Sequence, residues 1–247
     1  MRLFGLIGQP LTHSFSASYF AAKFDRQKIY DCQYQLFPLE KIELLPDLLE
    51  KNPSLEGLNI TIPYKEAVLP YLSTSFIPEG LDACNCIRIN KGRLEGYNTD
   101  CIGFEQSLLP LLQPRIQAAM VFGNGGAAKA VFHVLKKIGI PYTVVGRTEK
   151  LGIDKTFANL TAADMQAHQL LINTTPLGTF PAIEERPRLP YEAVGPGHTL
   201  YDLVYNPAIT AFLRAGEERG ARIKNGAELL QIQAEESWKI WNQTDRR

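Results

Sequence analysis

Hydrophobic residues recur in two rhythms along the first hundred residues. Short apolar runs bounded by turn residues predict strands, and apolar residues at helical spacing predict helices. Strands are predicted at 3–8, 33–37 and 57–62, and an antiparallel hairpin at 86–90 and 93–97 around Lys91-Gly92. Segments 16–24 and 42–49 are helix-like, although Pro46 interrupts the second. The alternation predicts a largely parallel sheet covered by helices, with one reversed edge.

A second alternating pattern begins near residue 100. Asp100 is a suitable N-cap for a helix that carries Phe104, Leu108 and Leu112. A domain boundary is therefore expected in or beside this helix. A loop rich in Pro and Glu is expected at 180–197. The remaining predicted elements are strands at 118–122, 142–145, 170–173 and 199–203, and helices at 130–138, 208–219 (with Pro207 at its start) and 227–241.

Composition narrows the class of protein. The chain has 247 residues, enough for one large or two modest domains, and 45% of them are hydrophobic, which is typical of a globular protein. Twenty-six basic residues balance twenty-six acidic ones, so a general nucleic-acid binder is not expected. No apolar run reaches the ~18 residues of a membrane span, and the apolar start of the chain is too short for a signal peptide.

The cysteines do not indicate a metal site or a disulfide framework. There are four, and Cys84 and Cys86 lie closer together than the usual spacing of zinc ligands. We therefore expect a cytoplasmic enzyme with reduced, mostly buried thiols and no bound metal.

A glycine-rich loop follows the predicted strand at 118–122. The segment Gly123-Asn124-Gly125-Gly126-Ala127-Ala128 fits G-x-G-x-x-(G/A) and leads into a helix pattern. In such a loop the first glycine permits a tight turn, the second lets the backbone approach a pyrophosphate, and the third small residue lets helix and strand pack closely. The helix N-terminus then offers N–H groups to the phosphates. This pattern predicts a dinucleotide site.

The end of the next strand indicates which dinucleotide binds. NAD enzymes typically place an acidic residue there, whereas this chain has Arg147-Thr148, with Lys150 close by. A guanidinium group suits a 2′-phosphate by its charge and its bidentate geometry. The alternative is a solvated surface arginine, and Glu149 nearby slightly weakens the assignment. The predicted cofactor is NADP(H).

Polar residues gather at the ends of the predicted strands in the first hundred residues. In open α/β sheets ligands bind beyond the carboxyl ends of the strands, so these groups are expected to face one crevice. Their types suit a small polyhydroxylated ligand, and a Lys–Asp pair suits the relay of an alcohol proton. Each also has an ordinary structural interpretation, as a cap, a turn residue or a surface lysine. The candidates are Ser14, Ser16, Asn59, Thr61, Lys65, Asn85, Asn98, Thr99 and Asp100.

Together these strings resemble the shikimate dehydrogenase family over nearly the whole chain and in the same order. Gly8-Gln9-Pro10 with His13-Ser14-Phe15-Ser16 is similar to the family's G-x-P-x-x-H-S-x-S. The segments 59–65, 96–103 and 123–128 resemble its N-V-T-x-P-[FH]-K, G-x-N-T-D-x-x-G and G-A-G-G-A-[SA]. Further similarity lies in Arg147-Thr148, 173–178, 202–207 and 225–234.

The resemblance implies an α/β enzyme of two domains. Residues 1–100 with 226–247 would form a substrate-binding and catalytic domain with a mostly parallel sheet, and 101–225 a Rossmann-like NADP-binding domain, with a cleft between them. The implied reaction is the reversible reduction of 3-dehydroshikimate to shikimate with NADPH, in the biosynthesis of chorismate and the aromatic amino acids. The only implied partner is this small-molecule substrate, with no nucleic acid and no membrane, and the chain is expected as a monomer or homodimer.

The resemblance also implies roles for individual residues. Lys65 and Asp100 would form the catalytic pair, and whether Lys65 is itself the base stays open. Ser14 and Ser16, with Tyr205, would bind the substrate carboxylate, whereas Thr61, Asn85, Asp100 and Gln233 would hold the ring hydroxyls. Leu203 and Gly226 would flank the nicotinamide. The rest of the cofactor would contact Gly123, Asn124, Gly125, Gly126, Ala127, Arg147 and Thr148.

Several positions depart from the family pattern. Gly146 replaces the asparagine before Arg147, which is expected to weaken discrimination against NAD; Cys86 and Leu229 also differ. The span 149–169 is short, so the usual crossover helix is expected to be shortened or replaced by a loop. Two alternatives stay open: a quinate/shikimate dehydrogenase that uses NAD or both cofactors, and a non-catalytic NADP-binding regulator.

Overall fold

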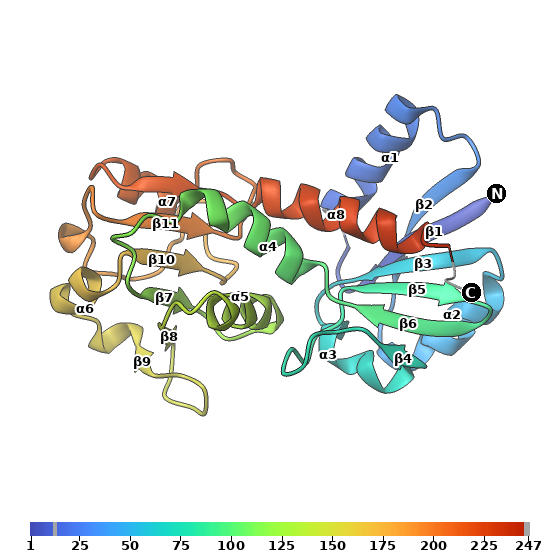
Figure 1. Cartoon of the computed structure of the whole chain (residues 1–247), viewed down its shortest axis with the longest axis horizontal. Coiled ribbons are helices and arrows are strands. Elements are labelled where there is room, and N and C mark those ends of the chain that lie inside the picture. Colours follow the sequence, from blue (N-terminus) through green and yellow to red (C-terminus); the bar gives the residue numbers. More distant parts are fainter. Residues whose placement is uncertain (12–13, 245–247) are drawn as a thin grey trace. The chain divides into compact units, whose positions relative to one another are not determined.

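The computed structural model describes residues 1–11 and 14–244, so His13 of the opening motif lies outside the described residues. The chain divides into two compact units. The first unit comprises Met1–Gly103 and Leu230–Arg247, and the second comprises Phe104–Leu229. The divisions fall inside helix α4 (Asp100–Leu108) and helix α8 (Ala227–Trp241) (Figure 1).

The first unit contains a six-stranded mixed sheet in the order β2-β1-β3-β5-β6-β4. Strands β1, β2 and β3 are parallel, and β5 is antiparallel to both of its neighbours. The predicted reversed edge is therefore wrong, because the reversed strand β5 lies inside the sheet, between β3 and β6. The strands are β1 (Arg2–Gly8), β2 (Cys32–Pro38), β3 (Leu55–Ile60), β4 (Thr74–Ser75), β5 (Cys86–Asn90) and β6 (Arg93–Tyr97).

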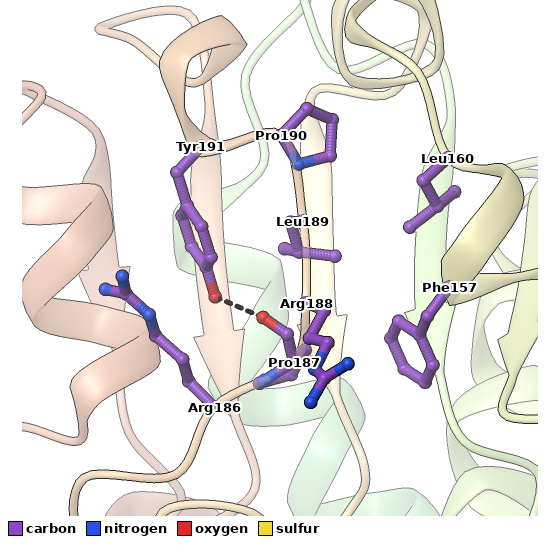
Figure 2. Close-up of a pocket in the computed structure, with 8 residues that line it drawn as sticks. All are labelled: Phe157, Leu160, Arg186, Pro187, Arg188, Leu189, Pro190 and Tyr191. Atoms are coloured by element: carbon purple, nitrogen blue, oxygen red, sulfur yellow. Dashed lines mark hydrogen bonds between the residues drawn. The ribbon is translucent and has the colours of Figure 1, made fainter.

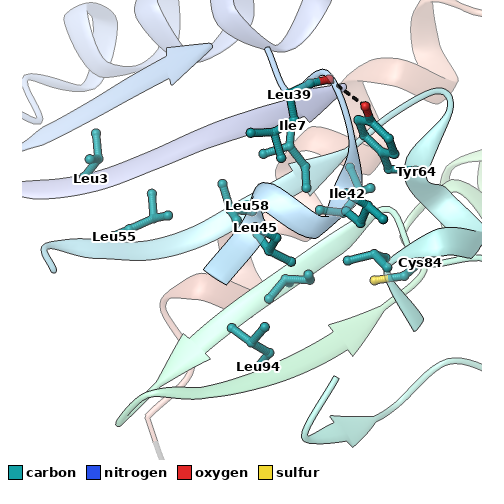
Figure 3. Packing of buried hydrophobic residues seen from close by; sticks show 13 residues of the cluster. Leu3, Ile7, Leu39, Ile42, Leu45, Leu55, Leu58, Tyr64, Cys84 and Leu94 are labelled. Carbon is teal, nitrogen blue, oxygen red and sulfur yellow. Dashed lines mark hydrogen bonds between the residues drawn. The ribbon is translucent and has the colours of Figure 1, made fainter. Parts of the chain in front are cut away.

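Both faces of this sheet are covered, because successive side chains of a strand point to opposite faces. On one face Leu3 and Ile7 pack with Leu45, Leu58 and other buried residues (Figure 3). On the other face Phe4 packs with Phe20 and with Trp241 of α8. The helical elements of the unit are α1 (Phe15–Gln27), η1 (Ile42–Leu44), α2 (Leu45–Lys51), α3 (Tyr64–Ala67) and η2 (Leu69–Tyr71).

Pro46 does not interrupt a helix, contrary to the prediction for 42–49. It occupies the first turn of α2, after the separate 3₁₀ turn η1. Proline fits the first turn of a helix because its missing N–H would have no partner within the helix there.

The second unit has a six-stranded sheet in which every pairing is parallel. Counted in chain order within the unit, the strands lie in the order 3-2-1-4-5-6, which is the Rossmann arrangement. The order reverses between β7 and β10, where ligands of such sheets bind. The strands are β7 (Ala119–Phe122), β8 (Tyr142–Gly146), β9 (Lys155–Thr156), β10 (Leu170–Asn173), β11 (Thr199–Asp202) and β12 (Arg222–Lys224).

Two helices of this unit begin where the sequence does not place them. Helix α5 (Gly126–Lys137) starts inside the glycine-rich segment. Helix α7 (Ala211–Glu217) starts after Thr210, whose hydroxyl accepts from the Leu213 amide (3.3 Å). The prediction that Pro207 stands at the start of a helix is therefore wrong, because the cap is supplied by Thr210.

The connections that cover this sheet are short. As expected for 149–169, the crossover is reduced to η4 (Phe157–Asn159) and the six-residue helix α6 (Ala162–Ala167). The predicted loop at 180–197 contains the 3₁₀ turn η5 (Tyr191–Ala193), and Tyr191 and Val194 are buried in the core. It is therefore not entirely a surface loop. Helix α4 gives way to η3 (Leu109–Leu111) before Leu112.

Within residues 1–11 and 14–244, no helix combines the length and apolar character needed to cross a bilayer.

Candidate active site

Lys65 and Asp100 form an ion pair in the first unit. The Lys65 Nζ lies 2.6 Å from Asp100 Oδ2, and both side chains are largely buried, at 15% and 16% exposed. Lys65 belongs to the one-turn helix α3, which the buried Tyr64 anchors by donating its hydroxyl hydrogen to the Leu39 carbonyl (2.5 Å). The Lys65 carbonyl accepts from the Cys84 amide (2.7 Å). The backbone around this lysine is therefore held on both sides.

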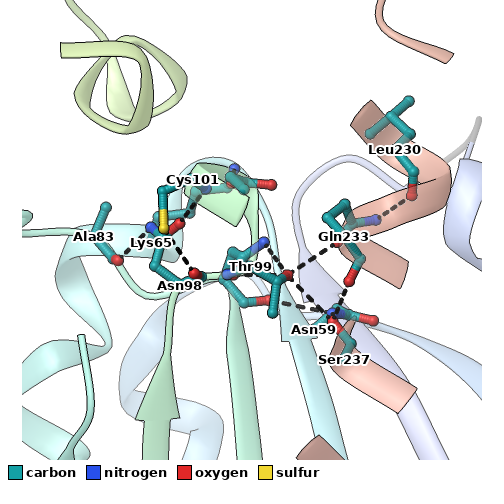
Figure 4. Close-up of polar contacts among 11 residues, drawn as sticks. Asn59, Lys65, Ala83, Asn98, Thr99, Cys101, Leu230, Gln233 and Ser237 are labelled. Atoms are coloured by element: carbon teal, nitrogen blue, oxygen red, sulfur yellow. Dashed lines mark hydrogen bonds and ion pairs between the residues drawn. The ribbon is translucent and has the colours of Figure 1, made fainter. Parts of the chain in front are cut away.

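Asp100 is not the cap of its helix. It is the first residue of α4, and the Asn98 side chain accepts from the Cys101 amide (3.0 Å) in its place. Asn98 in turn donates to the Ala83 carbonyl (2.7 Å) (Figure 4). Because Asn98 satisfies the helix terminus, the Asp100 carboxylate is available to pair with Lys65.

Asn85 and Gln233 meet at the hydroxyl of Thr99, which is fully buried. The Asn85 side chain accepts from the Thr99 amide (2.6 Å) and donates to its hydroxyl oxygen (3.0 Å). The Thr99 hydroxyl lies 3.4 Å from Gln233 Oε1 (Figure 4). The structure thus brings together Asn85 and Gln233, which the resemblance assigns to one ligand. They meet at Thr99, which the sequence gives only as a candidate.

Ser14, Ser16 and Thr61 follow the carboxyl ends of β1 and β3. Ser14 caps α1 by accepting from the Ala17 amide (3.2 Å), and Ser16 is half-buried in the first turn of this helix. The Thr61 amide donates to the Ile7 carbonyl (2.9 Å), and its methyl group fills the space over Gly8. Ser14 therefore has the predicted capping role, which leaves its hydroxyl hydrogen available to a ligand.

The glycine-rich loop lies at the switch point of the second sheet. Gly123 has a φ of +102°, and a Cβ there would lie 2.7 Å from Thr174 Oγ1, in the loop that follows β10. Gly125 is the N-cap of α5, and a Cβ there would meet no atom within 4 Å. The helix N-terminus is thus open to a phosphate group, and the loop residues Asn124, Gly126 and Ala127 are half-buried around it.

Arg147 and Thr148 are exposed after β8. Arg147 makes no hydrogen bond or ion pair with another described residue, so its guanidinium group is available to an anion. A Cβ at Gly146 would lie 2.6 Å from the Ile153 side chain. Gly146, which departs from the family pattern, therefore leaves the space that the Ile153 side chain occupies.

The loop after β11 carries Leu203 and Tyr205, and Gly226 lies beside it. A Cβ at Gly226 would lie 2.1 Å from the Leu203 carbonyl oxygen, and the Gly226 amide donates to the Val204 carbonyl (3.1 Å). The structure therefore brings together the two residues expected to flank the nicotinamide, and no side chain fits at position 226.

Sequence reasoning gave no role to Asp202, which holds this loop. Its carboxylate is fully buried and accepts from the Thr210 hydroxyl (2.6 Å), the Asn173 side chain (2.9 Å) and the Val204 amide (3.0 Å). Burial raises the pKa of Asp202 from 3.8 to about 6, against the opposing effect of these donors. In the sequence, Asp202 is distinguished only by its position in a segment that resembles a family motif, between a buried strand and a polar loop.

One pocket of the second unit lies apart from these residues. It has a volume of about 400 Å³, and none of the predicted substrate or cofactor residues lines it. The Tyr191 hydroxyl donates to the Pro187 carbonyl (2.8 Å) at its wall (Figure 2). The Arg186 guanidinium lies over the Tyr191 ring, 4.5 Å from its centroid.

The described cysteines are free and buried. Burial raises the pKa of Cys84 to about 12, so its thiol stays protonated and is a poor metal ligand. Across the part of the chain that the structure describes, no three His, Cys, Asp or Glu side chains group as metal ligands.

Comparison with known proteins gives one consistent family. Residues 6–87 match the family described as the shikimate dehydrogenase substrate binding domain. A shikimate dehydrogenase (NADP(+)) of Clostridium beijerinckii is 36% identical, over 98% of this chain and 93% of that protein. The crystal structure of shikimate dehydrogenase from Aquifex aeolicus has a TM-score of 0.86 at 28% identity, covering 100% of this chain and 94% of that one.

A third comparison concerns a structure with its ligands. Shikimate 5-dehydrogenase from Thermus thermophilus, solved in complex with NADP(H) and shikimate, has a TM-score of 0.84 at 29% identity. The match covers 98% of this chain and 94% of that chain.

Proposed function

The chain belongs to the shikimate dehydrogenase family, and we propose that it catalyses the NADP-dependent interconversion of shikimate and 3-dehydroshikimate, in the direction of shikimate during aromatic biosynthesis. The observation that carries the proposal is the Lys65–Asp100 pair, which stands beside a set of buried amides in the same unit. The second unit supplies the Rossmann sheet and an open phosphate-binding loop.

Lys65 and Asp100 are proposed to handle the proton of the reacting alcohol. Oxidation of a secondary alcohol removes a hydride from carbon and a proton from oxygen, and reduction of the ketone adds both. NADP⁺ supplies the hydride acceptor when bound, and NADPH the donor. The Lys65 ammonium group can stabilise negative charge on the reacting oxygen and exchange its proton, and Asp100 orients the ammonium group at 2.6 Å.

The remaining polar groups are proposed to hold the ligand. Ser14 and Ser16, with Tyr205, suit a carboxylate because hydroxyl groups donate to it, whereas Thr61, Asn85, Asp100 and Gln233 suit ring hydroxyls. Asn85 and Gln233 are 3% and 5% exposed, so each offers only a small polar edge. Such sites reject analogues that lack a hydroxyl, because the buried polar groups are then left unpaired.

The cofactor groups are assigned on the same basis. The loop from Gly123 to Ala127 and the α5 N-terminus fit the pyrophosphate, because a side chain at Gly123 would collide with Thr174 and the space over Gly125 is open. Arg147, which has no hydrogen bond or ion pair within the described residues, fits with Thr148 the 2′-phosphate that distinguishes NADP from NAD. Leu203 and Gly226 are assigned to the nicotinamide.

The test is an assay of purified protein with shikimate and with quinate, each with NADP⁺ and with NAD⁺. Turnover mainly of shikimate with NADP⁺ is the expected result. Comparable rates with quinate or NAD⁺ would move the protein to the dual-specificity branch, with the Gly146 position as the cause. Tight binding of NADP⁺ without turnover of either acid would favour a regulator.

A further inference from the structure

Hydrogen bonds link three residues without a proposed substrate contact, Tyr34, Asn59 and Ser237, to Gln233. The Tyr34 hydroxyl donates to Asn59 Oδ1 (2.9 Å). Asn59 Nδ2 donates to Ser237 Oγ (2.9 Å), and the Ser237 hydroxyl donates to the Gln233 carbonyl (2.9 Å). These bonds therefore connect Tyr34 of β2 with Gln233, which is proposed for a ring hydroxyl.

The direction of each of these bonds is set by backbone groups, which only donate or only accept. The Asn85 carbonyl faces Asn59 Nδ2 (3.3 Å), so the Asn59 amide cannot be turned over. Its oxygen therefore faces Tyr34, and the phenol must be the donor. Burial raises the pKa of Tyr34, so this donor stays protonated.

The same reasoning fixes the orientation of the Asn85 and Gln233 side-chain amides, which we assign to the ligand. The Thr99 amide donates to Asn85 Oδ1, and the Leu230 carbonyl accepts from Gln233 Nε2 (3.0 Å). The side-chain oxygens of Asn85 and Gln233 therefore both face Thr99. Each NH₂ group donates one of its two hydrogens to another group of the protein. No further bond to a described residue uses the second hydrogen of either NH₂ group.

Ser237 completes this arrangement because its hydroxyl hydrogen is used on the Gln233 carbonyl. In its contact with the Thr99 hydroxyl (3.3 Å) Ser237 must therefore accept. The Thr99 hydrogen is then directed among three acceptors, Ser237 Oγ, Asn85 Oδ1 and Gln233 Oε1, and never toward the ligand. Ser237 is fully buried in α8 and Asn59 is 3% exposed.

We propose that Tyr34, Asn59 and Ser237 are positioning residues: Asn59 and Ser237 hold the backbone carbonyls of Asn85 and Gln233, whose side-chain amides then face the substrate as hydrogen-bond donors only. The ring oxygens of the substrate are then recognised as acceptors at these two amides, and the Asp100 carboxylate is the acceptor for a hydroxyl hydrogen. The inference rests on the proposed function, because it concerns how that substrate is recognised. It separates a set of residues that tune substrate affinity from the Lys65–Asp100 pair.

The test is steady-state kinetics of Ser237→Ala and Tyr34→Phe. For Ser237→Ala we expect the KM for shikimate to rise about 5- to 10-fold, the loss of one or two hydrogen bonds, with kcat and the KM for NADP⁺ changed by less than about threefold. Tyr34→Phe removes a more distant donor, so a rise of about two- to fourfold is expected. The ¹⁵N–¹H resonances of the Gln233 side chain should also shift in Ser237→Ala without substrate.

The matched control is Ser107→Ala, which removes another buried hydroxyl, one that contacts Tyr201 (2.6 Å) in the second unit. It should lower the melting temperature to a similar extent and leave the KM for shikimate unchanged. A lower melting temperature with an unchanged KM in both test variants would show that these hydrogen bonds have only a structural role. That result would overturn the inference. If Ser237→Ala does not fold, Tyr34→Phe decides.

Failure of the proposed function is distinguishable from failure of this inference. A wild-type protein that does not turn over shikimate contradicts the function, whatever the variants do. The Gln233 resonances still test the donor arrangement in that case, and unchanged resonances in Ser237→Ala would contradict it.

Discussion

Lys65 and Asp100 hold each other in one geometry because each is anchored by its own backbone and both are largely shielded from water. An exposed ion pair of this kind would contribute little, since solvent screens it. Here Tyr64 anchors the helix that carries Lys65, and Asn98 accepts from the first turn of the helix that begins at Asp100. Residues that hold the backbone thus prepare the reacting groups.

Replacing Lys65 removes the proposed proton-handling group without disturbing the second unit. For Lys65→Ala we expect kcat to fall by about 10²- to 10⁴-fold, the usual contribution of general acid–base catalysis. The dissociation constant for NADP⁺, measured by fluorescence titration, should change little. Lys137→Ala, which removes only an exposed pair with Glu105, is the control and should keep full activity. An unaltered kcat in Lys65→Ala would remove this lysine from the mechanism.

Arg147 is expected to act only on the 2′-phosphate. For Arg147→Ala the KM for NADP⁺ should rise roughly 10- to 100-fold, the cost of losing hydrogen bonds to a charged group, whereas the KM for NAD⁺ should hardly change. Arg147→Lys keeps the charge but loses the bidentate geometry, so an intermediate KM is expected. Initial rates with both cofactors check this, and equal weakening of NADP⁺ and NAD⁺ binding would contradict the assignment.

At the scale of elements, Asp202 ties the end of β11 to the start of α7 and to the loop after β10. Its pKa is raised from 3.8 to about 6, so the folded state binds more protons than the unfolded state between these pH values. The free energy of unfolding therefore falls as pH rises through this window. A shift of about 2 units corresponds to about 3 kcal/mol.

Asp202→Asn isolates this contribution, because the amide resembles the protonated carboxyl and does not titrate. We expect the stability of the wild type relative to Asp202→Asn to fall by about 2–3 kcal/mol between pH 4 and pH 7. Urea denaturation of both proteins at several pH values measures this difference, in which titration of other groups cancels. Parallel pH profiles would show that Asp202 does not titrate in this range.

The sequence predicts the longer strands well because each is a distinct apolar run between turn residues. It misses β4, β9 and β12, since two or three residues are too few for a hydrophobic period, and they exist only because a neighbouring strand pairs with them. Helix starts fail for a related reason. The cap at Thr210 depends on Asp202, which lies eight residues away in the chain.

The site is predictable to the extent that it depends on short strings. Lys65 and Asp100 lie in two recognisable motifs, and the structure pairs them. The hydrogen bonds through Tyr34, Asn59 and Ser237 join residues that lie far apart in the sequence, and the Asn59–Ser237 bond spans 178 positions. The residues next to a buried helical serine do not indicate that it has such a distant partner. Tertiary packing alone brings these groups together.

At the scale of the whole molecule, each unit has its own hydrophobic core. The C-terminal part of α8 completes the core of the first unit, to which it returns after the whole of the second unit. Trp241 stacks on Phe4 with 4.8 Å between ring centroids, and its Nε1 donates to the Ile87 carbonyl (3.0 Å). A Cβ at Gly57 would lie 2.3 Å from this indole, so the strand is shaped to receive it.

Trp241 should therefore determine the stability of the first unit. It is 4% exposed, and Trp241→Ala is expected to cost about 3–5 kcal/mol, as for other large buried aromatic residues. Both tryptophans of the chain, Trp238 and Trp241, lie on α8 in this unit, so the fluorescence of the remaining Trp238 reports its unfolding in urea. Trp241→Phe keeps part of the packing against Phe4 and loses the bond to Ile87, so its midpoint should fall between those of Trp241→Ala and the wild type. A midpoint for Trp241→Ala equal to that of the wild type would show that the first unit holds its fold without the end of α8.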